Sequence, residues 1–308
     1  MQNQTYYSNG KLLLTAEYVV LDGAKALAVP TKFGQNLIVK PGKNNEILWT
    51  SFDSDNTIWF QDTITFEEIK HKTTSSKNLA VKNTLIEILH QAQIQNPELL
   101  QANGYVIETH LTFPRNWGLG TSSTLINNIG QWLQIDAFEL LQKSFGGSGY
   151  DIACAQTNEP ILYWLTNEKA HFETVSFDPS FKENIHFVYL NQKQSSKSAI
   201  VNYRNKQQSV HKVIPEINQI THEILQCNDG KSFALLMEKH QAIMSNLLET
   251  ITVKEHLFPD FKGIIKSLGA WGGDFVMVIS KENPTNYFNN KGYETVIPYQ
   301  EMVLQLES

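Results

Sequence analysis

Short apolar runs broken by turn residues dominate the first third of the chain. Apolar and polar positions alternate within several of these runs, and Gly23, Gly34 and Pro41-Gly42 separate them. Alternation places every second side chain on one face of a strand, so this pattern predicts a β-rich opening. The predicted strands are Lys11–Val20, Ala26–Pro30, Asn36–Val39, Glu46–Ser51 and Thr57–Thr65.

From Asn78 to Gln95 the apolar residues recur at helical spacing, and Asn96-Pro97 ends the pattern, which predicts an amphipathic helix. The same reasoning extends over the rest of the chain. It predicts helices at Thr124–Leu133, Ala137–Ser144, Val210–Cys227, Ser232–Leu248 and Phe258–Leu268, and strands at Tyr105–Phe113, Pro160–Thr166, Ile185–Leu190, Phe275–Ile279 and Tyr293–Ile297.

Polar residues interrupt the periodic pattern between Glu168 and Asn184, which predicts a boundary between two domains, residues 1–170 and 171–308. A chain of 308 residues is long enough to bury two cores. We therefore expect two domains.

The charge balance excludes several classes of partner. Lys and Arg number 25 against 31 Asp and Glu, a net charge of −6, and no dense basic stripe is present. We therefore expect neither a nucleic-acid partner nor a membrane surface. The longest apolar run, Leu12 to Leu21, is too short to span a bilayer. The two cysteines, Cys154 and Cys227, exclude a disulfide scaffold, and together these features predict a cytoplasmic protein.

A glycine turn followed by three hydroxyl residues, at positions 114–123, carries the first chemical signal. Gly118 and Gly120 allow the backbone to approach a ligand closely, and the helix predicted next directs unpaired N–H groups at the turn. A polyphosphate fits such a site. The alternative is an ordinary strand–turn–helix junction in which a Ser or Thr caps the helix.

Three further segments extend this signal along the chain. Residues 10–23 place a lysine, a glutamate and an aspartate among apolar residues; residues 146–153 read Gly-Gly-Ser-Gly-Tyr-Asp-Ile-Ala; and residues 266–274 end in Trp-Gly-Gly-Asp. In this order and spacing the four segments resemble the GHMP kinases, and the resemblance spans nearly the whole chain. It implies a two-domain α+β fold, with an N-terminal domain like the second domain of ribosomal protein S5 and a ferredoxin-like C-terminal domain.

The resemblance also implies the roles of individual residues. Asp151 matches the catalytic aspartate and Lys11 the lysine that steadies developing charge, while Ser122 matches the serine that meets Mg²⁺. Without the resemblance, Asp151 reads as a helix N-cap and Lys11 as a solvated lysine at a strand edge. The expected ATP-binding residues are Pro114, Trp117, Gly118, Leu119, Gly120, Thr121, Ser122, Ser123, Gly269, Gly272 and Gly273.

The resemblance also implies which residues lie on the acceptor side. We expect Glu17, Ser148 and Tyr150 to contact the acceptor, together with Ser195, Ser196 and Lys197 of the polar segment 191–198, in which Lys193 and Lys197 suit an anionic ligand. The alternative for that segment is a solvated basic loop.

Two positions depart from the family pattern, since Ala16 and Trp271 stand where the family usually has glycine. A second carboxylate for Mg²⁺ has no assignment, because Glu139 is one step out of register.

Other enzyme classes lack their signatures in this chain. The Walker pattern, the HExxH zinc motif and the GxSxG elbow are all absent. The resemblance therefore implies an ATP- and Mg²⁺-dependent kinase of a mevalonate-pathway acceptor, and we expect a monomer or homodimer. Phosphomevalonate is favoured as acceptor, and the alternatives are a mevalonate kinase or a catalytically silent ligand-binding relative.

Overall fold

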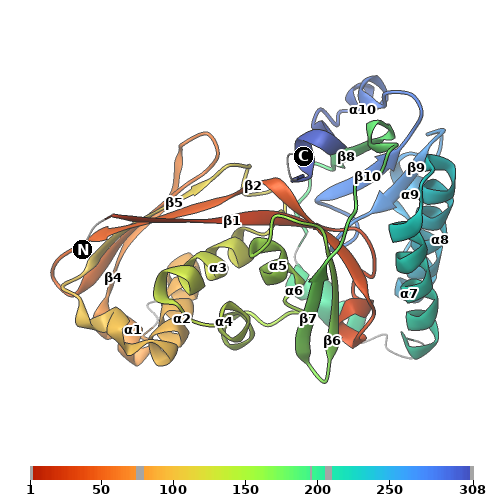
Figure 1. Cartoon of the computed structure of the whole chain (residues 1–308). Helices are drawn as coiled ribbons and strands as arrows, with labels where there is room; N and C mark the ends of the chain where they lie inside the picture. Colours follow the sequence, from red (N-terminus) through yellow and green to blue (C-terminus); the bar gives the residue numbers. More distant parts are fainter. Residues whose placement is uncertain (1–2, 74–79, 195, 205–209, 306–308) are drawn as a thin grey trace. The chain divides into compact units, whose positions relative to one another are not determined.

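The computed structural model describes residues 3–73, 80–194, 196–204 and 210–305 (Figure 1). The chain forms two compact units that are not continuous in sequence. Unit 1 comprises Met1–Gly10, Phe33–Arg115 and Leu119–Gln156, and unit 2 comprises Lys11–Lys32, Asn116–Gly118 and Thr157–Ser308. The α+β class predicted from the sequence is confirmed, and the division at residue 170 stays a proposal.

Unit 1 is built on a mixed sheet. Its elements are the first part of β1 (Gln4–Leu13), the second half of β2 (Ala26–Pro41), β3 (Glu46–Phe52), β4 (Ile58–Thr65), α1 (Phe66–His71), α2 (Ala80–Gln95), η2 (Pro97–Gln101), β5 (Tyr105–Leu111), α3 (Thr121–Leu133), α4 (Ala137–Ser144) and α5 (Tyr150–Ala155). Strand β3 pairs antiparallel with β4 and parallel with β5, and β5 pairs antiparallel with β2 over Gln35–Pro41.

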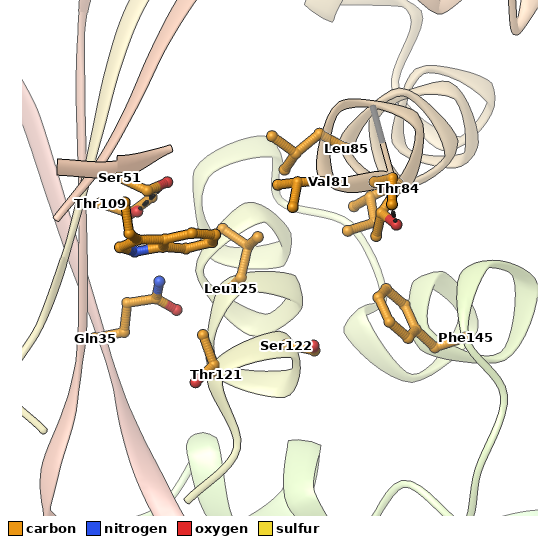
Figure 2. Close-up of a pocket in the computed structure, with 13 residues that line it drawn as sticks. Gln35, Ser51, Val81, Thr84, Leu85, Thr109, Thr121, Ser122, Leu125 and Phe145 are labelled. Atoms are coloured by element: carbon orange, nitrogen blue, oxygen red, sulfur yellow. Dashed lines mark hydrogen bonds between the residues drawn. The ribbon is translucent and has the colours of Figure 1, made fainter. Parts of the chain in front are cut away.

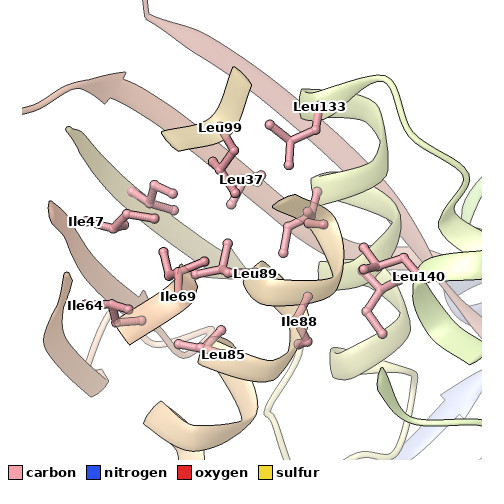
Figure 3. Close-up of a cluster of buried hydrophobic side chains, with 14 of the residues drawn as sticks. Leu37, Ile47, Ile64, Ile69, Leu85, Ile88, Leu89, Leu99, Leu133 and Leu140 are labelled. Carbon is pink, nitrogen blue, oxygen red and sulfur yellow. The ribbon is translucent and has the colours of Figure 1, made fainter. Parts of the chain in front are cut away.

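The core of unit 1 lies where α2, α3 and α4 cover one face of this sheet (Figures 1 and 3). Strand β5 alternates buried and partly exposed residues along its whole length, as a strand with one covered face should. Ile47 of β3 and Ile107 of β5 face Leu85 and Leu89 of α2 in one buried cluster. The helical spacing predicted for residues 78–95 is thus confirmed, with Ala80–Gln95 as the observed bounds.

Unit 2 contains a four-stranded antiparallel sheet in the order β11-β8-β10-β9. Its elements are the last residues of β1, η1 (Val19–Asp22), the first half of β2, β6 (Ile161–Thr166), β7 (Lys169–Thr174), η3 (Lys182–Asn184), β8 (Ile185–Tyr189), α6 (Ser196–Arg204), α7 (Val210–Gln226), α8 (Gly230–Leu248), α9 (Val253–Leu257), β9 (Ile264–Ser267), β10 (Phe275–Ile279), α10 (Thr285–Asn290), β11 (Val296–Pro298) and α11 (Tyr299–Met302). Every residue of β8 and β10 is buried, so both faces of these central strands are covered.

The helix predicted over Phe258–Leu268 is wrong. Helix α9 ends at Leu257, and Ile264–Ser267 forms strand β9, in which Ile264 and Ile265 pair with β10. Two features favour this outcome. Ile264 and Ile265 are β-branched, which suits a strand, and a Cβ on the preceding Gly263 would lie 2.5 Å from the carbonyl oxygen of Ile279.

The two strands predicted at 26–30 and 36–39 are one continuous strand, β2. Gly34 does not make a turn between them. A Cβ at Gly34 would lie 2.5 Å from Tyr7 Oη and closer still to the Ser8 carbonyl oxygen, so glycine permits close backbone approach within unit 1.

Strand β7 was not anticipated, because its side chains are almost all exposed and its sequence is polar. It pairs with β6 through a two-residue turn at Asn167 and Glu168, both at positive φ, as hairpin turns of this length favour. No helix in the described ranges is long and apolar enough to cross a membrane.

Candidate functional site

The glycine turn after β5 leads directly into α3, and its conformation depends on glycine. Gly118 and Gly120 have φ values of +71° and +103°, in the left-handed region where a Cβ is costly. Gly120 is the N-cap of α3 and no side chain caps this helix. The alternative reading, a junction capped by Ser or Thr, is therefore wrong, and the hydroxyls of Thr121 and Ser122 are not used as caps.

The hydroxyls of the turn do not all point the same way. Thr121 and Ser122 line a pocket of unit 1 (Figure 2). Ser123 is buried, and its hydroxyl donates to the Gly120 carbonyl at 2.9 Å, so it closes the turn. Leu119 is also fully buried, which makes its side chain part of the packing.

The pocket beside Thr121 and Ser122 has a volume of about 300 Å³ and mainly apolar walls. Leu125 comes from α3, Val81 and Leu85 from α2, and Phe145 from the end of α4 (Figure 2). The full lining is Gln35, Ser51, Trp59, Ala80, Val81, Thr84, Leu85, Ile88, Thr109, Thr121, Ser122, Leu125 and Phe145. Such a pocket suits a flat, largely apolar group of a small ligand.

A few polar groups in this pocket are fixed by neighbours, and one is left unsatisfied. Ser51 Oγ accepts from Thr109 Oγ1 at 2.9 Å and from the Trp49 indole at 3.0 Å. The indole N–H of Trp59 is buried and has no hydrogen-bond partner among the described residues. The Arg115 guanidinium lies 5.4 Å from the centre of the Trp59 ring. A buried donor without a partner favours a ligand that brings an acceptor.

Asp151 lies at the second position of α5, not at its cap. The N-cap is Gly149, with φ +91°, and the Asp151 carboxylate accepts from the Ile152 N–H at 3.1 Å. The interpretation of Asp151 as an N-cap is therefore wrong. Tyr150 is half-buried and Ser148 is buried.

In unit 2, Lys11 near the end of β1 donates from Nζ to the Gly118 carbonyl at 2.9 Å. The side chain of Trp117 packs edge-on against Phe275, with ring centres 5.4 Å apart. Tyr189 donates from its hydroxyl to the Asn116 carbonyl at 3.1 Å. These contacts fix segment 116–118 within unit 2, and they give Trp117 a packing role.

The third glycine segment has the bent backbone that its composition predicts. Gly269 and Gly272 have positive φ values of +57° and +91°. At Gly273, a Cβ would lie 2.6 Å from the Gln192 carbonyl oxygen, a backbone atom, so only glycine fits. Trp271, which stands where the family usually has glycine, is buried, and its indole N–H has no partner among the described residues.

Glu17, expected near the acceptor, lies in the interior of unit 2. Its carboxylate accepts a hydrogen bond from Lys266 Nζ, and both side chains are fully buried. Burial raises the pKa of Glu17 and lowers that of Lys266, because each loses hydration of its charged form. His240 Nε2 accepts from the Ala16 N–H at 2.8 Å, which makes that imidazole neutral.

Part of the predicted acceptor segment lies outside the part of the chain that the structure describes. Ser195 lies outside the described residues, and the side chains of Ser196 and Lys197, at the start of α6, are not described either. Lys193 is exposed. Among the described residues no group of three or more His, Cys, Asp or Glu could hold a metal ion.

The sequence-based reasoning missed the residues that form the pocket walls. Periodicity predicts ordinary core positions in the strand and helices that supply these walls, which include Trp59, Val81, Leu85 and Leu125. Asp274 closes the third glycine segment and received no role. The positive φ of this non-glycine residue, +51°, emerges only in the structure.

Solved structures of known proteins match this chain over nearly its whole length. Mevalonate kinase from Methanococcus jannaschii matches with a TM-score of 0.70 and 16% identity, over 96% of each chain. Phosphomevalonate kinase from Streptococcus pneumoniae, in complex with phosphomevalonate and AMPPNP, matches with a TM-score of 0.69 and 13% identity, over 94% of this chain and 95% of that chain. Galactokinase from Lactococcus lactis, complexed with galactose, matches with a TM-score of 0.65 and 10% identity, over 94% and 88%.

No protein-family model and no curated protein sequence matches the chain. The structural matches establish the fold, which is the two-domain α+β fold of the GHMP kinases, as the resemblance of the four motifs predicts.

Proposed function

We propose that this chain, which has the two-domain GHMP kinase fold, is an ATP-dependent kinase that phosphorylates a small anionic acceptor. The observation that carries the proposal is the apolar pocket at the start of α3, lined by Thr121 and Ser122 directly after the glycine turn. A base binds in such a pocket, while the helix N-terminus and hydroxyls receive phosphates.

Unit 1 offers an apolar pocket for the base of a nucleotide and a helix N-terminus for its phosphates. The indole of Trp59 and the side chains of Leu85 and Leu125 supply apolar surface for a nucleobase, and the unpartnered Trp59 N–H supplies a donor for a ring nitrogen. The free N–H groups at the start of α3 attract anionic oxygens. ATP has this division between an apolar base and an anionic tail.

The donor set for Mg²⁺ in the described residues is small. Ser122 offers a neutral hydroxyl oxygen of a kind that Mg²⁺ accepts, and in the part of the chain that the structure describes no group of three His, Cys, Asp or Glu accompanies it. This fits an ion that arrives with the nucleotide and keeps phosphate and water oxygens as its other ligands. An Mg²⁺ ion held by Ser122 would supply positive charge to the transferring phosphoryl group.

For the acceptor we propose that Asp151 accepts or orients the proton of the attacking hydroxyl, and that Lys11 steadies the developing charge. Gly149 takes the capping position of α5, so Asp151 is not needed as its N-cap. Because phosphoryl transfer depends on positioning and charge neutralisation, a carboxylate and an ammonium are the groups that such a site requires.

Phosphomevalonate is the acceptor we favour, because Gly-Ser-Gly-Tyr-Asp at 147–151 and the aspartate that ends the third segment look most like phosphomevalonate kinase. The solved phosphomevalonate kinase with its substrate and AMPPNP has the same fold. Mevalonate is the second choice. A ligand-binding protein without catalysis is the alternative from another class, and Trp271 in the third glycine segment favours it.

The test is an acceptor screen with ATP consumption as its readout, together with calorimetric titration of AMPPNP. We expect AMPPNP binding, and turnover with phosphomevalonate at a higher kcat/KM than with mevalonate. Turnover of a sugar or an amino acid instead would show that the acceptor belongs to another chemical class. AMPPNP binding without turnover of any acceptor would support the silent binder.

A further inference from the structure

Asp274 holds the segment that follows β8 at three points. Its N–H donates to the Gln192 carbonyl at 2.6 Å, and its carbonyl accepts from the Leu190 N–H at 2.8 Å. Its carboxylate Oδ1 accepts from the Gln194 N–H at 3.2 Å. One residue thus fixes the path of residues 190–194, which include the exposed Lys193.

The same carboxylate lies against the glycine turn. A Cβ built on Gly118 would lie 2.5 Å from Asp274 Oδ2. Lys11 reaches the same glycine, because its Nζ donates to the Gly118 carbonyl at 2.9 Å. Segment 116–118 is therefore bounded by the carboxylate of Asp274 and by the ammonium of Lys11, all within unit 2.

Asp274 is acidic, yet it lies beside a glycine turn that suits phosphates, and two nearby lysines compensate its negative charge. Burial raises the pKa of Asp274, and the Gln194 N–H and the positive charges of Lys11 and Lys193 oppose that rise. Two ammonium groups therefore act on one carboxylate, and the three groups together carry a surplus positive charge. An anion can be received by such a group, whereas a lone carboxylate would repel it.

We propose that Asp274 is a positioning residue: its carboxylate, which lies beside Gly118 and accepts from the Gln194 N–H, uses its charge to keep the Lys11 ammonium at Gly118 in the arrangement that receives an anionic acceptor. The expected effect of Asp274 on kinetics rests on the proposed function, because it requires the protein to be a kinase. The positioning of Lys11 itself is independent of catalysis and can be measured without any substrate.

The central variant is Asp274→Asn, which keeps the size of the side chain and an oxygen that accepts from the Gln194 N–H. We expect the melting temperature to stay close to wild type and kcat/KM for the acceptor to fall at least about tenfold, as loss of a positioning charge predicts. Asp260→Asn is the matched control, because Asp260 is an exposed carboxylate of unit 2 that pairs with Lys291 at 3.0 Å. That variant should keep wild-type activity.

Competitive acetylation of lysines, read by mass spectrometry on the substrate-free protein, tests the charge interaction between Asp274 and Lys11 directly. A nearby carboxylate favours the ammonium form, which does not react, so Lys11 should be labelled several times faster in Asp274→Asn. Lys291 should be labelled faster only in Asp260→Asn. An unchanged labelling rate of Lys11 in a folded Asp274→Asn protein overturns the inference, whatever the activity.

A double-mutant cycle with Lys11→Met separates positioning from a general structural role. If Asp274 acts through Lys11, the double variant should be no slower than Lys11→Met alone. If the double variant instead loses rate by the product of the two single-variant losses, Asp274 acts independently of Lys11 and the proposal is overturned. Faster labelling of Lys11 in a protein that phosphorylates no acceptor would uphold the positioning of Lys11 and refute the kinase.

Discussion

Glu17 accepts a hydrogen bond from Lys266 in the interior of unit 2, where both side chains are fully buried. Glu17 follows the strand that carries Lys11, and Lys266 precedes the third glycine segment, so the pair joins two segments 249 residues apart. Lys266 also donates to the Ser267 carbonyl at 2.7 Å. A buried pair of this kind is costly to break, because the partner left behind keeps an uncompensated charge.

We therefore expect Glu17→Gln to lower the free energy of unfolding by about 3 to 5 kcal/mol. Urea denaturation measures this change. The double variant Glu17→Met/Lys266→Met, which removes both charges, should be more stable than Glu17→Gln. As control, Glu108→Gln breaks the partly exposed Lys40–Glu108 pair and should cost at most about 1 kcal/mol. A Glu17→Gln protein as stable as this control would contradict the prediction.

His240 should make stability depend on pH. Burial, with the charge of Lys266, holds the pKa of His240 well below its ordinary value of 6.5. A group whose pKa is lowered by folding contributes stability above the unfolded pKa, and that contribution is lost as pH falls toward the folded pKa. We expect the stability advantage of wild type over His240→Gln to shrink below pH 6.5, by up to about 1.4 kcal/mol per pH unit. Denaturation at several pH values measures it, and a constant difference would refute it.

Ala16 occupies a backbone conformation that favours glycine, with φ +61°. Any residue with a Cβ pays about 1 to 2 kcal/mol of steric strain in this conformation. Glycine avoids that strain but loses more backbone entropy on folding, so the two effects on the free energy of unfolding nearly cancel. Ala16→Gly should therefore leave the melting temperature unchanged or raise it. Ala28→Gly, at an equally buried position in β2, should lower stability by about 1 kcal/mol or more, since glycine is unfavourable within a strand. Equal losses in the two variants would contradict the strain at Ala16.

Thr84→Trp should fill the pocket of unit 1 and weaken AMPPNP binding at least about tenfold, a loss of about 1.4 kcal/mol. Thr84 is exposed at the pocket wall on α2, so the larger side chain can be accommodated without unfolding the helix. Ile94→Trp, at an exposed position of α2 outside the pocket, is the control and should bind AMPPNP normally. Calorimetric titration gives both values. Normal binding by a folded Thr84→Trp protein would exclude the pocket as the nucleotide site.

Asp151→Asn removes a charge while it keeps the size of the side chain and an oxygen that accepts from Ile152. If Asp151 acts on the acceptor hydroxyl, kcat should fall at least about a hundredfold. The melting temperature and AMPPNP affinity should stay near wild type. Steady-state kinetics, thermal melts and titration together separate this result from a structural effect. Full activity in the variant would remove Asp151 from the mechanism.

Local sequence alone predicted much of this protein. The glycine turn, the helices on either side of Asp136 and the buried strands near Ile185 and Phe275 follow from periodicity and from the backbone freedom of glycine, which act within a few residues. The motif order predicted the fold. The helix wrongly predicted at 258–268 is strand β9 because Ile264 and Ile265 pair with β10, a contact that local propensity does not contain.

Tertiary structure decided which predicted residues could share a site. Glu17 is predicted from the sequence as an acceptor contact, yet it is buried, and Lys266, near the other end of the chain, supplies its countercharge. Trp59 and Leu125 read as core residues, and only packing leaves a pocket between them and α2. The role proposed for Asp274 rests on Gly118 and Gln194, which the fold places beside it. Burial and charge pairing depend on contacts between distant segments, so no local pattern could have fixed them.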